Sequence, residues 1–290
     1  MGGDKIKNFG IDISVWQKGI SLSELDNNGV QFVIVRAGHT ASDKSLNIDS
    51  QFEYNYLNLK NVNMPLGCYY YSRATTYEEG RKEAVYLYSN CLKNKTFEYP
   101  IYIDVEDTKY QQLAGKDNIT LAIKGFCETL EDLGYYVGIY CNLNWANNYL
   151  NYNELKDKYD FWLAAWNNER PDTNKYRYGM WQFGGSINKL RSPVIASFIC
   201  DQDYAYKDYP KIMKEKFLNG FVKKEEIEEP KDTEIEPIEE PKDTETGPIE
   251  EPKDIDNEPI EDEKKVENIW IKLLKEVIKN IIKFLKKKNI

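Results

Sequence analysis

The sequence has few of the residues on which metal and redox sites depend. It contains one histidine, His39, and no pair of cysteines at C-x-x-C spacing. Neither a zinc site nor a dithiol redox centre therefore has ligands at a usual spacing. A chain of 290 residues also needs no disulfide framework. We expect buried free thiols at the five cysteines, which are Cys68, Cys91, Cys127, Cys141 and Cys200.

Targeting and membrane-spanning segments are missing from the sequence as well. Residues 1–8 include no apolar stretch of the kind that a secretory signal contains. No segment approaches the roughly 20 consecutive apolar residues that a membrane span needs. A glycine-rich phosphate loop and a Ser-His-Asp order are also absent. We therefore expect a protein made in the reducing cytoplasm, with no cofactor, no metal ion and no nucleic-acid partner.

Charge divides the chain into three segments. Residues 1–224 carry 27 basic and 27 acidic side chains, residues 225–262 carry 3 and 18, and residues 263–290 carry 9 and 3. The net charge of −9 therefore describes none of these segments. We predict a globular domain at residues 1–220, a linker at 221–262 and a helix at 263–290.

The predicted linker contains an eleven-residue repeat at residues 227–259, IEEPKDTEIEP, IEEPKDTETGP and IEEPKDIDNEP. A period of eleven can indicate a right-handed coiled coil, but two prolines in each repeat exclude a continuous helix. The self-repelling acidic charge and the lack of aromatic residues favour an extended, disordered spacer.

The last segment, residues 263–290, has apolar residues at helical spacing and lysines on the opposite face. This pattern predicts a basic amphipathic helix. Three partners for its apolar face stay open. The helix can lie on anionic membrane or wall polymers, it can self-associate into a bundle, or it can fold back on the acidic linker.

Residues 1–220 alternate between β-type runs and segments of helical length. Strands are expected at residues 9–13, 31–37, 66–71, 100–105, 136–141, 161–166, 178–183 and 197–200. Helices are expected at residues 21–28, 49–60, 76–93 and 118–133. Glu78, Glu79 and Glu83 load the first turns of the third helix, and Gly134 follows the fourth as a terminating residue. The order predicts parallel βαβ units in a closed barrel whose last helices are missing.

Carboxylates stand at the predicted ends of three strands. Asp104 and Glu106 lie two residues apart in IYIDVED, so they project from the same side of that strand. Asp12 lies within the first strand, and Asp201 ends the last one with Asp203 two residues later. Because the first and last strands of a barrel are neighbours, we expect these acids to converge at its mouth, as glycoside hydrolysis requires. The alternative is that the two acids of IYIDVED are a turn cap and a loop charge.

Aromatic and amide side chains at other strand ends are candidates for binding sugar rings and their N-acetyl groups. Taken singly, each such ring belongs more often to a core than to a binding site. These candidates are Tyr69, Tyr71, Tyr140, Trp166, Trp181 and Gln182. Arg36, which closes the second strand, is expected to be an internal partner of the carboxylates and to lie in the binding site with Asp203.

The run DISVWQ at residues 12–17 resembles the opening D-x-S-x-W-Q motif of the family 25 glycoside hydrolases, the Chalaropsis-type lysozymes. IDVE at residues 103–106 resembles their central D-x-E motif. WLAAW at residues 162–166, the pair Trp181 and Gln182, and Asp201 follow in the expected order. The resemblance covers about residues 8–210, and it implies an irregular TIM-like α/β fold, a (β/α)5(β)3 barrel.

The same resemblance implies an N-acetylmuramidase that cleaves the β-1,4 bond between N-acetylmuramic acid and N-acetylglucosamine in the glycan strands of peptidoglycan. Glu106 is then the general acid, and Asp104 orients or stabilises the substrate's own N-acetyl group as the nucleophile. The last strand departs from the family, because Asp203 stands where many members have asparagine.

Three roles for the whole chain stay open. A phage or prophage endolysin, held in the host cytoplasm until a holin-type release, fits the missing signal. A host autolysin or a muramidase exported by another route is the second possibility. A non-catalytic glycan-binding barrel with a helical anchor is the third, and the presence of both Asp104 and Glu106 speaks against it.

Overall fold

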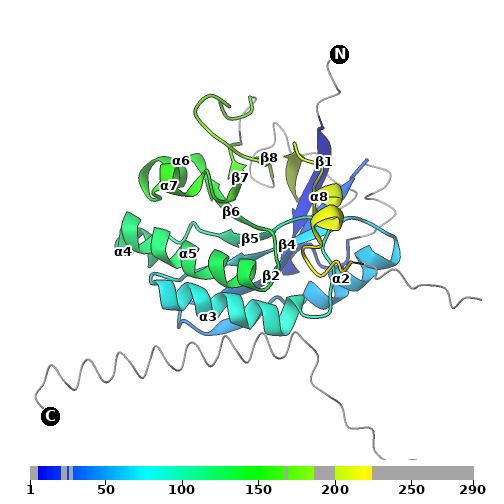
Figure 1. Cartoon of the computed structure of the whole chain (residues 1–290), viewed down its shortest axis with the longest axis horizontal. Coiled ribbons are helices and arrows are strands. Elements are labelled where there is room, and N and C mark those ends of the chain that lie inside the picture. The colour runs from blue at the N-terminus through cyan, green and yellow to red at the C-terminus, as the bar shows by residue number, and fades with distance from the viewer. Residues whose placement is uncertain (1–5, 21–24, 26–28, 167–168, 186–199, 224–290) are drawn as a thin grey trace, which may run out of the picture. The chain divides into compact units, whose positions relative to one another are not determined.

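Figure 1 shows the chain as a computed structural model, which describes residues 6–20, 25, 29–166, 169–185 and 200–223. The chain separates into two units, Met1–Lys224 and Glu225–Ile290. The predicted acidic linker and basic helix lie outside the described residues, as does all but one residue of the helix expected at residues 21–28. These three expectations stay predictions.

Eight strands close into a barrel, as the sequence predicts (Figure 1). Their order around the barrel is β1-β9-β8-β7-β6-β5-β4-β2, and pairing of β1 with β2 closes the ring. The strands are β1 (Asn8–Ile13), β2 (Phe32–Thr40), β4 (Leu66–Tyr71), β5 (Ile101–Asp104), β6 (Val137–Asn142), β7 (Asp160–Ala164), β8 (Met180–Gly184) and β9 (Asp201–Ala205). A short strand that the sequence did not predict, β3 (Leu46–Ile48), pairs antiparallel with the end of β2.

The last strand runs against the others. β1, β2 and β4 to β8 are parallel, whereas β9 is antiparallel to both of its neighbours, β1 and β8. Residues 197–199 of the expected last strand lie outside the described residues, and the expectation that Asp201 ends a strand was wrong, because Asp201 begins β9. Since β9 is reversed, its first residue lies at the edge of the barrel where the parallel strands end. Asp201 therefore still reaches the barrel mouth.

Helices cover the outside of the first half of the barrel (Figure 1). The expected ones are α2 (Phe52–Asn61), α3 (Tyr77–Leu87), which continues as a π-helical turn (Tyr88–Leu92), and α5 (Lys116–Asp132). Shorter ones that the sequence did not predict are η1 (Val15–Gln17), α4 (Gln111–Ala114), α6 (Leu143–Asn148), α7 (Tyr152–Leu155) and α8 (Tyr209–Lys216). The described residues between β7 and β8 contain no helix, so this connection lacks the helix of a regular barrel, as expected.

Two glycines let α3 and α5 pack closely against each other. A Cβ atom on Gly80 would overlap the carbonyl oxygen of Ala122, and one on Gly125 would overlap the carbonyl oxygen of Tyr77. The packing of this helix pair therefore depends on the absence of side chains at these two positions.

The N-terminus of α3 is capped by Thr76, whose side chain accepts a hydrogen bond from the backbone N–H of Glu79. Such caps contribute on the order of 1 kcal/mol.

Glu83 lies in α3, as expected, and it is a buried acid. It is 2% exposed. Its carboxyl group accepts hydrogen bonds from Thr40 Oγ1, Ser72 Oγ and the backbone N–H of Arg73. It therefore ties α3 to the last residue of β2 and to the chain that follows β4.

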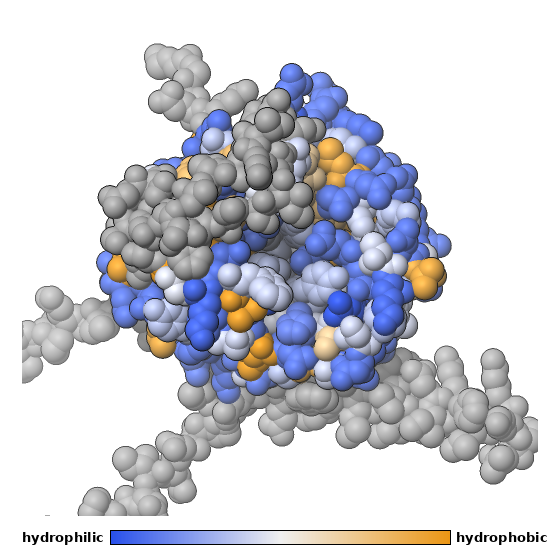
Figure 2. Space-filling model, turned by 180° about the vertical axis from the view of Figure 1, so that it is seen from behind, coloured by the Kyte–Doolittle hydropathy of each residue, from blue (hydrophilic) through white to orange (hydrophobic). Residues whose placement is uncertain are grey.

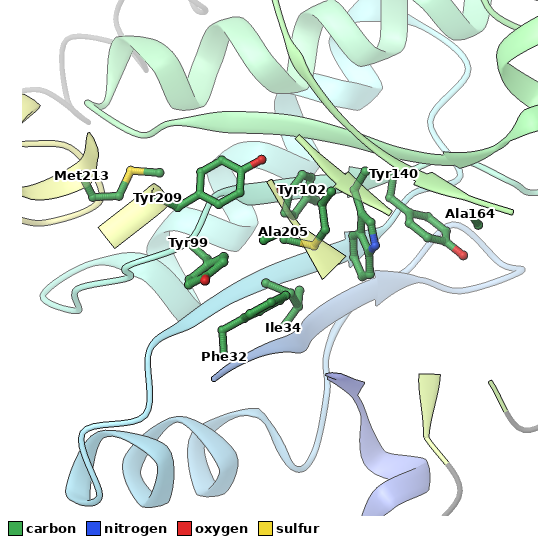
Figure 3. Close-up of a cluster of buried hydrophobic side chains, with 11 residues drawn as sticks. Phe32, Ile34, Tyr99, Tyr102, Tyr140, Ala164, Ala205, Tyr209 and Met213 are labelled. Atoms are coloured by element: carbon green, nitrogen blue, oxygen red, sulfur yellow. The ribbon is translucent and has the colours of Figure 1, made fainter. Parts of the chain in front are cut away.

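Aromatic side chains fill the barrel below its mouth (Figure 3). Phe32 stacks on Tyr99 with ring centroids 4.3 Å apart, and Trp162 packs edge-on against Tyr140 at 4.5 Å. Tyr209 of α8 closes the far end of this cluster. The five cysteines are buried free thiols, as expected.

The surface of the described part is mainly polar. Figure 2 shows a face on which hydrophilic residues surround a central hollow, with apolar residues in scattered patches. Scattered apolar residues are ordinary on the surface of a globular protein. None of the described helices has the length and apolar character that crossing a membrane would require.

Candidate active site

A cleft of about 360 Å³ opens at the ends of the later strands. It is lined by Glu106, Tyr140, Asn142, Ala164, Trp166, Gln182 and Asp201. Most of these residues are at the C-terminal ends of parallel strands, where barrel enzymes hold their catalytic groups. Five of the seven are residues that the sequence singled out.

Strand register places the predicted acids side by side. Asp12 on β1 lies directly opposite Asp201 on β9. Asp104 ends β5 between two tyrosines, Tyr71 on β4 and Tyr140 on β6. The structure therefore brings the carboxyl groups of the first, fourth and last barrel strands together at the mouth.

Burial and mutual repulsion raise the proton affinity of these acids. Burial, and then the charges of Asp201 and Glu106, raise the pKa of Asp12 well above its ordinary value. Burial, and then the charges of Glu106 and Asp12, raise the pKa of Asp104 in the same way, while the Arg36 guanidinium lowers it. Because each of these acids changes the pKa of its neighbours, they titrate as a set rather than singly.

Glu106 differs from the other acids because it lines the cleft. Its side chain is half-buried, and burial followed by the charge of Asp201 raises its pKa above the usual value. A carboxyl group that keeps its proton near neutrality and faces a cleft can act as a general acid.

Gln182 connects the acids to the aromatic residues. Its Nε2 donates a 2.8 Å hydrogen bond to Asp12 Oδ2. Its Oε1 accepts one from Tyr140 OH and one from Trp166 Nε1, each at 2.9 Å. Because both donors bind the oxygen, the amide nitrogen must face Asp12. Gln182 therefore orients a carboxylate and two rings, and its oxygen is already occupied.

Arg36 pairs with an acid that the sequence reasoning missed. Its Nε lies 2.6 Å from Asp49 Oδ2, which also accepts a hydrogen bond from the backbone N–H of Val15. The expected partnership of Arg36 with the strand-end acids is therefore indirect, through its charge near Asp104. Asp49 precedes α2, where an acid reads as an ordinary helix-terminal charge.

Two of the predicted aromatic contacts line the cleft, and two others do not. Tyr140 and Trp166 line the cleft. Tyr69 lies inside the barrel, edge-on to Trp162, and Tyr71 OH donates to Asp107 Oδ2 at 3.4 Å. Neither of these two rings lines the cleft.

The structure places Trp181 away from the cleft, contrary to expectation. Neighbours along a strand face opposite sides, and Gln182 faces the acids. Trp181 instead donates a hydrogen bond to the carbonyl oxygen of Ala165 and packs against Phe183 and Tyr204.

Asp203 is 0% exposed and therefore lies below the cleft rather than in it. Trp162 Nε1 donates a 2.7 Å hydrogen bond to Asp203 Oδ1. Asp203 was expected among the substrate contacts, and its complete burial is the reason that it cannot be one.

Two residues shape the cleft without having been predicted. Asn142 lines it and caps α6 by accepting a hydrogen bond from the backbone N–H of Trp145. Gly185 lies so close to two other lining residues that a Cβ there would overlap Asp201 Oδ1 and come within 2.7 Å of the Trp166 ring. Asparagine and glycine near the end of a strand are ordinary turn residues, so the sequence did not indicate that these two positions belong to the cleft.

A second and larger cleft, of about 530 Å³, lies beside α6 and α7. Glu154 is the one carboxyl group among its lining residues, and it is paired with Lys124. Glycoside hydrolysis commonly uses two acids, so the smaller cleft is the candidate active site. Among the described residues, no group of histidine, cysteine and acidic side chains is arranged to hold a metal ion.

Comparison with known proteins identifies a family of glycosyl hydrolases. Residues 11–190 match the family model described as glycosyl hydrolases family 25. The autolytic lysozyme of Clostridium acetobutylicum is 26% identical over 182 residues. That match covers 62% of this chain and 52% of the relative, so the chain spans about half the length of the curated protein it matches.

Several solved structures share the barrel. The CTP1L endolysin has a TM-score of 0.59 at 22% identity, over 72% of this chain and 70% of that one. A family GH25 lysozyme from Aspergillus fumigatus has a TM-score of 0.55 at 20% identity, over 69% and 94%. The autolysin LytC from Streptococcus pneumoniae, in complex with a synthetic peptidoglycan ligand, has a TM-score of 0.55 at 23% identity, over 69% and 47%.

Proposed function

The chain belongs to family 25 of the glycosyl hydrolases, and we propose that it hydrolyses peptidoglycan as an N-acetylmuramidase. The bond cleaved is the β-1,4 bond between N-acetylmuramic acid and N-acetylglucosamine. The observation that carries the proposal is Glu106, a half-buried acid with a raised pKa that lines a cleft beside other carboxyl groups. No cofactor is needed for this chemistry.

In the proposed mechanism Glu106 gives its proton to the glycosidic oxygen of the leaving sugar. As that bond breaks, positive charge develops on the remaining sugar ring, and the oxygen of its N-acetyl group forms a bond to the anomeric carbon. Water then replaces that oxygen at the anomeric carbon and gives a proton back to Glu106, which completes the hydrolysis. Asp104, two residues before Glu106 and 5% exposed, supplies negative charge at the mouth and orients or stabilises the substrate's N-acetyl group. Burial, and then the charges of Asp12 and Asp201, raise the pKa values of the neighbouring acids, which favours the protonated form of the donor.

The rings of Tyr140 and Trp166 are placed to bind the sugar. Both line the cleft, and both are fixed by hydrogen bonds to Gln182 Oε1. Sugar rings stack on aromatic faces through their C–H bonds. Since the oxygen of Gln182 already has two donors, we assign that residue to orientation of the site rather than to the substrate.

The relatives support peptidoglycan as the substrate class, since they include an autolytic lysozyme, an endolysin and an autolysin solved with a synthetic peptidoglycan ligand. We infer an endolysin that acts on the cell wall after a holin-type release from the host cytoplasm. An autolysin, or a muramidase exported by another route, is the alternative, and a muramidase activity dependent on Glu106 is common to both.

The test compares the full chain with its Glu106→Gln variant on purified sacculi. Loss of a general acid lowers turnover by about 10²–10⁴-fold, while thermal unfolding stays close to that of the wild type. Glu154→Gln, in the larger cleft, is the matched control and should stay active. Mass spectrometry of the wild-type products should find reducing N-acetylmuramic acid.

Two outcomes would contradict the proposal. Products that end in reducing N-acetylglucosamine would mean that the other glycosidic bond is cut. A wild-type chain that binds sacculi without releasing fragments would identify a glycan-binding barrel instead of an enzyme.

A further inference from the structure

A buried carboxyl group that the proposed reaction does not use lies beneath the cleft. Asp203 is opposite Gln182 in the β8–β9 ladder and opposite Gly10 in the β1–β9 ladder. It is two residues from Asp201, so both side chains face the inside of the barrel. Asp203 therefore lies farther from the barrel mouth than Asp12 and Asp201, by one inward-facing residue of β9.

The two carboxyl oxygens of Asp203 have different surroundings. Oδ1 accepts the hydrogen bond from Trp162 Nε1. Oδ2 is buried and receives no hydrogen bond from any donor in the described part of the chain. The adjacent acid is Asp12 on β1, which lies two residues from Gly10, the residue opposite Asp203. Two ionised carboxylates have only acceptors, so a hydrogen bond between these two acids requires that one of them be protonated.

The surroundings place that proton on Asp203. Asp12 is 7% exposed and its Oδ2 accepts the hydrogen bond from Gln182 Nε2, so a charge on Asp12 is partly compensated. Asp203 is 0% exposed. Ionisation of the fully buried acid, which has an oxygen without a donor, costs more than ionisation of its neighbour.

The titratable groups around Asp203 do not stabilise a negative charge there. Asp12 on β1 and Asp201 on β9 are acids, and Tyr102 on β5 and Cys200 before β9 are neutral at pH 7. Burial raises the pKa of Tyr102 well above its usual value and that of Cys200 to about 12. Burial, and then the charge of Asp12, raise the pKa of Asp203 well above its ordinary value.

We propose that Asp203 is a positioning residue that stays protonated at neutral pH and donates a hydrogen bond from Oδ2 to the Asp12 carboxylate. Asp203 and Gln182 then hold Asp12 from two directions, and no second charge is added below the mouth. Loss of this proton replaces an attraction with a repulsion and displaces Asp12 from its place opposite Asp201. The effect on turnover rests on the proposed muramidase function, whereas the protonation itself does not.

Two substitutions of Asp203 test whether its hydrogen-bond donor, and not its negative charge, is what the site needs. In Asp203→Asn, Nδ2 can donate to Asp12 while Oδ1 still accepts from Trp162. In Asp203→Leu, neither interaction remains. At pH 7 we expect kcat/KM on sacculi within about threefold of wild type for the asparagine variant and at least about tenfold lower for the leucine variant. The wild type should lose activity at alkaline pH as Asp203 ionises, and the asparagine variant should keep it to higher pH.

A stability measurement tests the protonation without any assay of activity. Above the ordinary pKa of 3.8, the unfolded wild type releases a proton that the folded protein keeps. The free energy of unfolding of the wild type therefore falls relative to that of Asp203→Asn as pH rises, with a slope that approaches one proton. The two free energies should run parallel below pH 3.8 and diverge above it.

Three outcomes would contradict the proposal for Asp203 or the proposed muramidase function. Parallel stability curves from pH 4 to 9 would show that Asp203 is ionised in the folded state and would overturn the proposal. An asparagine variant as inactive as the leucine variant would overturn it too, because the negative charge would then be required. A wild type without activity on sacculi at any pH would refute the muramidase proposal and leave the stability test of Asp203 standing.

Discussion

Replacing Glu83 with glutamine should make the free energy of unfolding less dependent on pH. Glu83 is buried, and burial raises the pKa of its carboxyl group from 4.5 to about 7. Hydrogen bonds from Ser72 and Thr40 lower this pKa but do not cancel the effect of burial. The folded protein thus holds a proton that the unfolded chain releases above pH 4.5.

The sign and the magnitude of this pH dependence follow from the difference in the pKa of Glu83 between the folded and unfolded states. The stabilisation by the Glu83 proton is fully present below pH 4.5 and is lost as pH rises through about 7. One pKa unit corresponds to about 1.4 kcal/mol, so the loss is on the order of 3 kcal/mol. Glutamine cannot ionise, and its amide can make hydrogen bonds to the same hydroxyl groups.

The assay is urea unfolding followed by tryptophan fluorescence at pH 4, 6 and 9. The free energy of unfolding of Glu83→Gln minus that of the wild type should increase by about 3 kcal/mol between the first pH and the last. Contributions from the acids of the cleft cancel in this difference. Glu154→Gln, at an exposed position, is the matched control for removal of one acidic side chain. A difference for Glu83→Gln that does not change with pH would refute the reasoning.

Two further predictions concern packing and the cleft. Gly125→Ala, whose methyl group would overlap the carbonyl oxygen of Tyr77, should cost about 1–3 kcal/mol in urea unfolding, whereas the exposed Leu121→Ala on the same helix should cost far less. Gln182→Leu, which removes the hydrogen bond to Asp12, should lower kcat/KM on sacculi by about 10–100-fold at an unchanged far-ultraviolet circular dichroism spectrum, and undiminished turnover would contradict its orienting role.

Much of the barrel could be predicted because its strands are buried on both sides. Continuous apolar runs marked seven of the eight barrel strands to within a few residues. β9 was misplaced because its sequence, DQDYA, is polar, while the apolar run before it reads more like a strand. Two of those polar residues are the inward-facing Asp201 and Asp203, so the demands of the site overrode the ordinary strand pattern.

The convergence of the acids could be predicted from topology alone, since closure makes β1 and β9 neighbours. Side-chain pairings between residues of different elements could not be predicted in this way. The ion pair of Arg36 with Asp49 joins β2 to the chain after β3, a strand that carries no strong local signal. Trp181 is different, because strand alternation already forbids adjacent residues such as Trp181 and Gln182 from both facing the cleft.

The missing side chain at Gly185 gives an indirect control over the chemistry. A methyl group there would have to displace Asp201 or the indole ring of Trp166, since it would overlap the first and nearly touch the second. Burial raises the pKa of Glu106 most, and the charge of Asp201 raises it further. Position 185 can therefore tune the acidity of the proton donor without replacing any ionisable group.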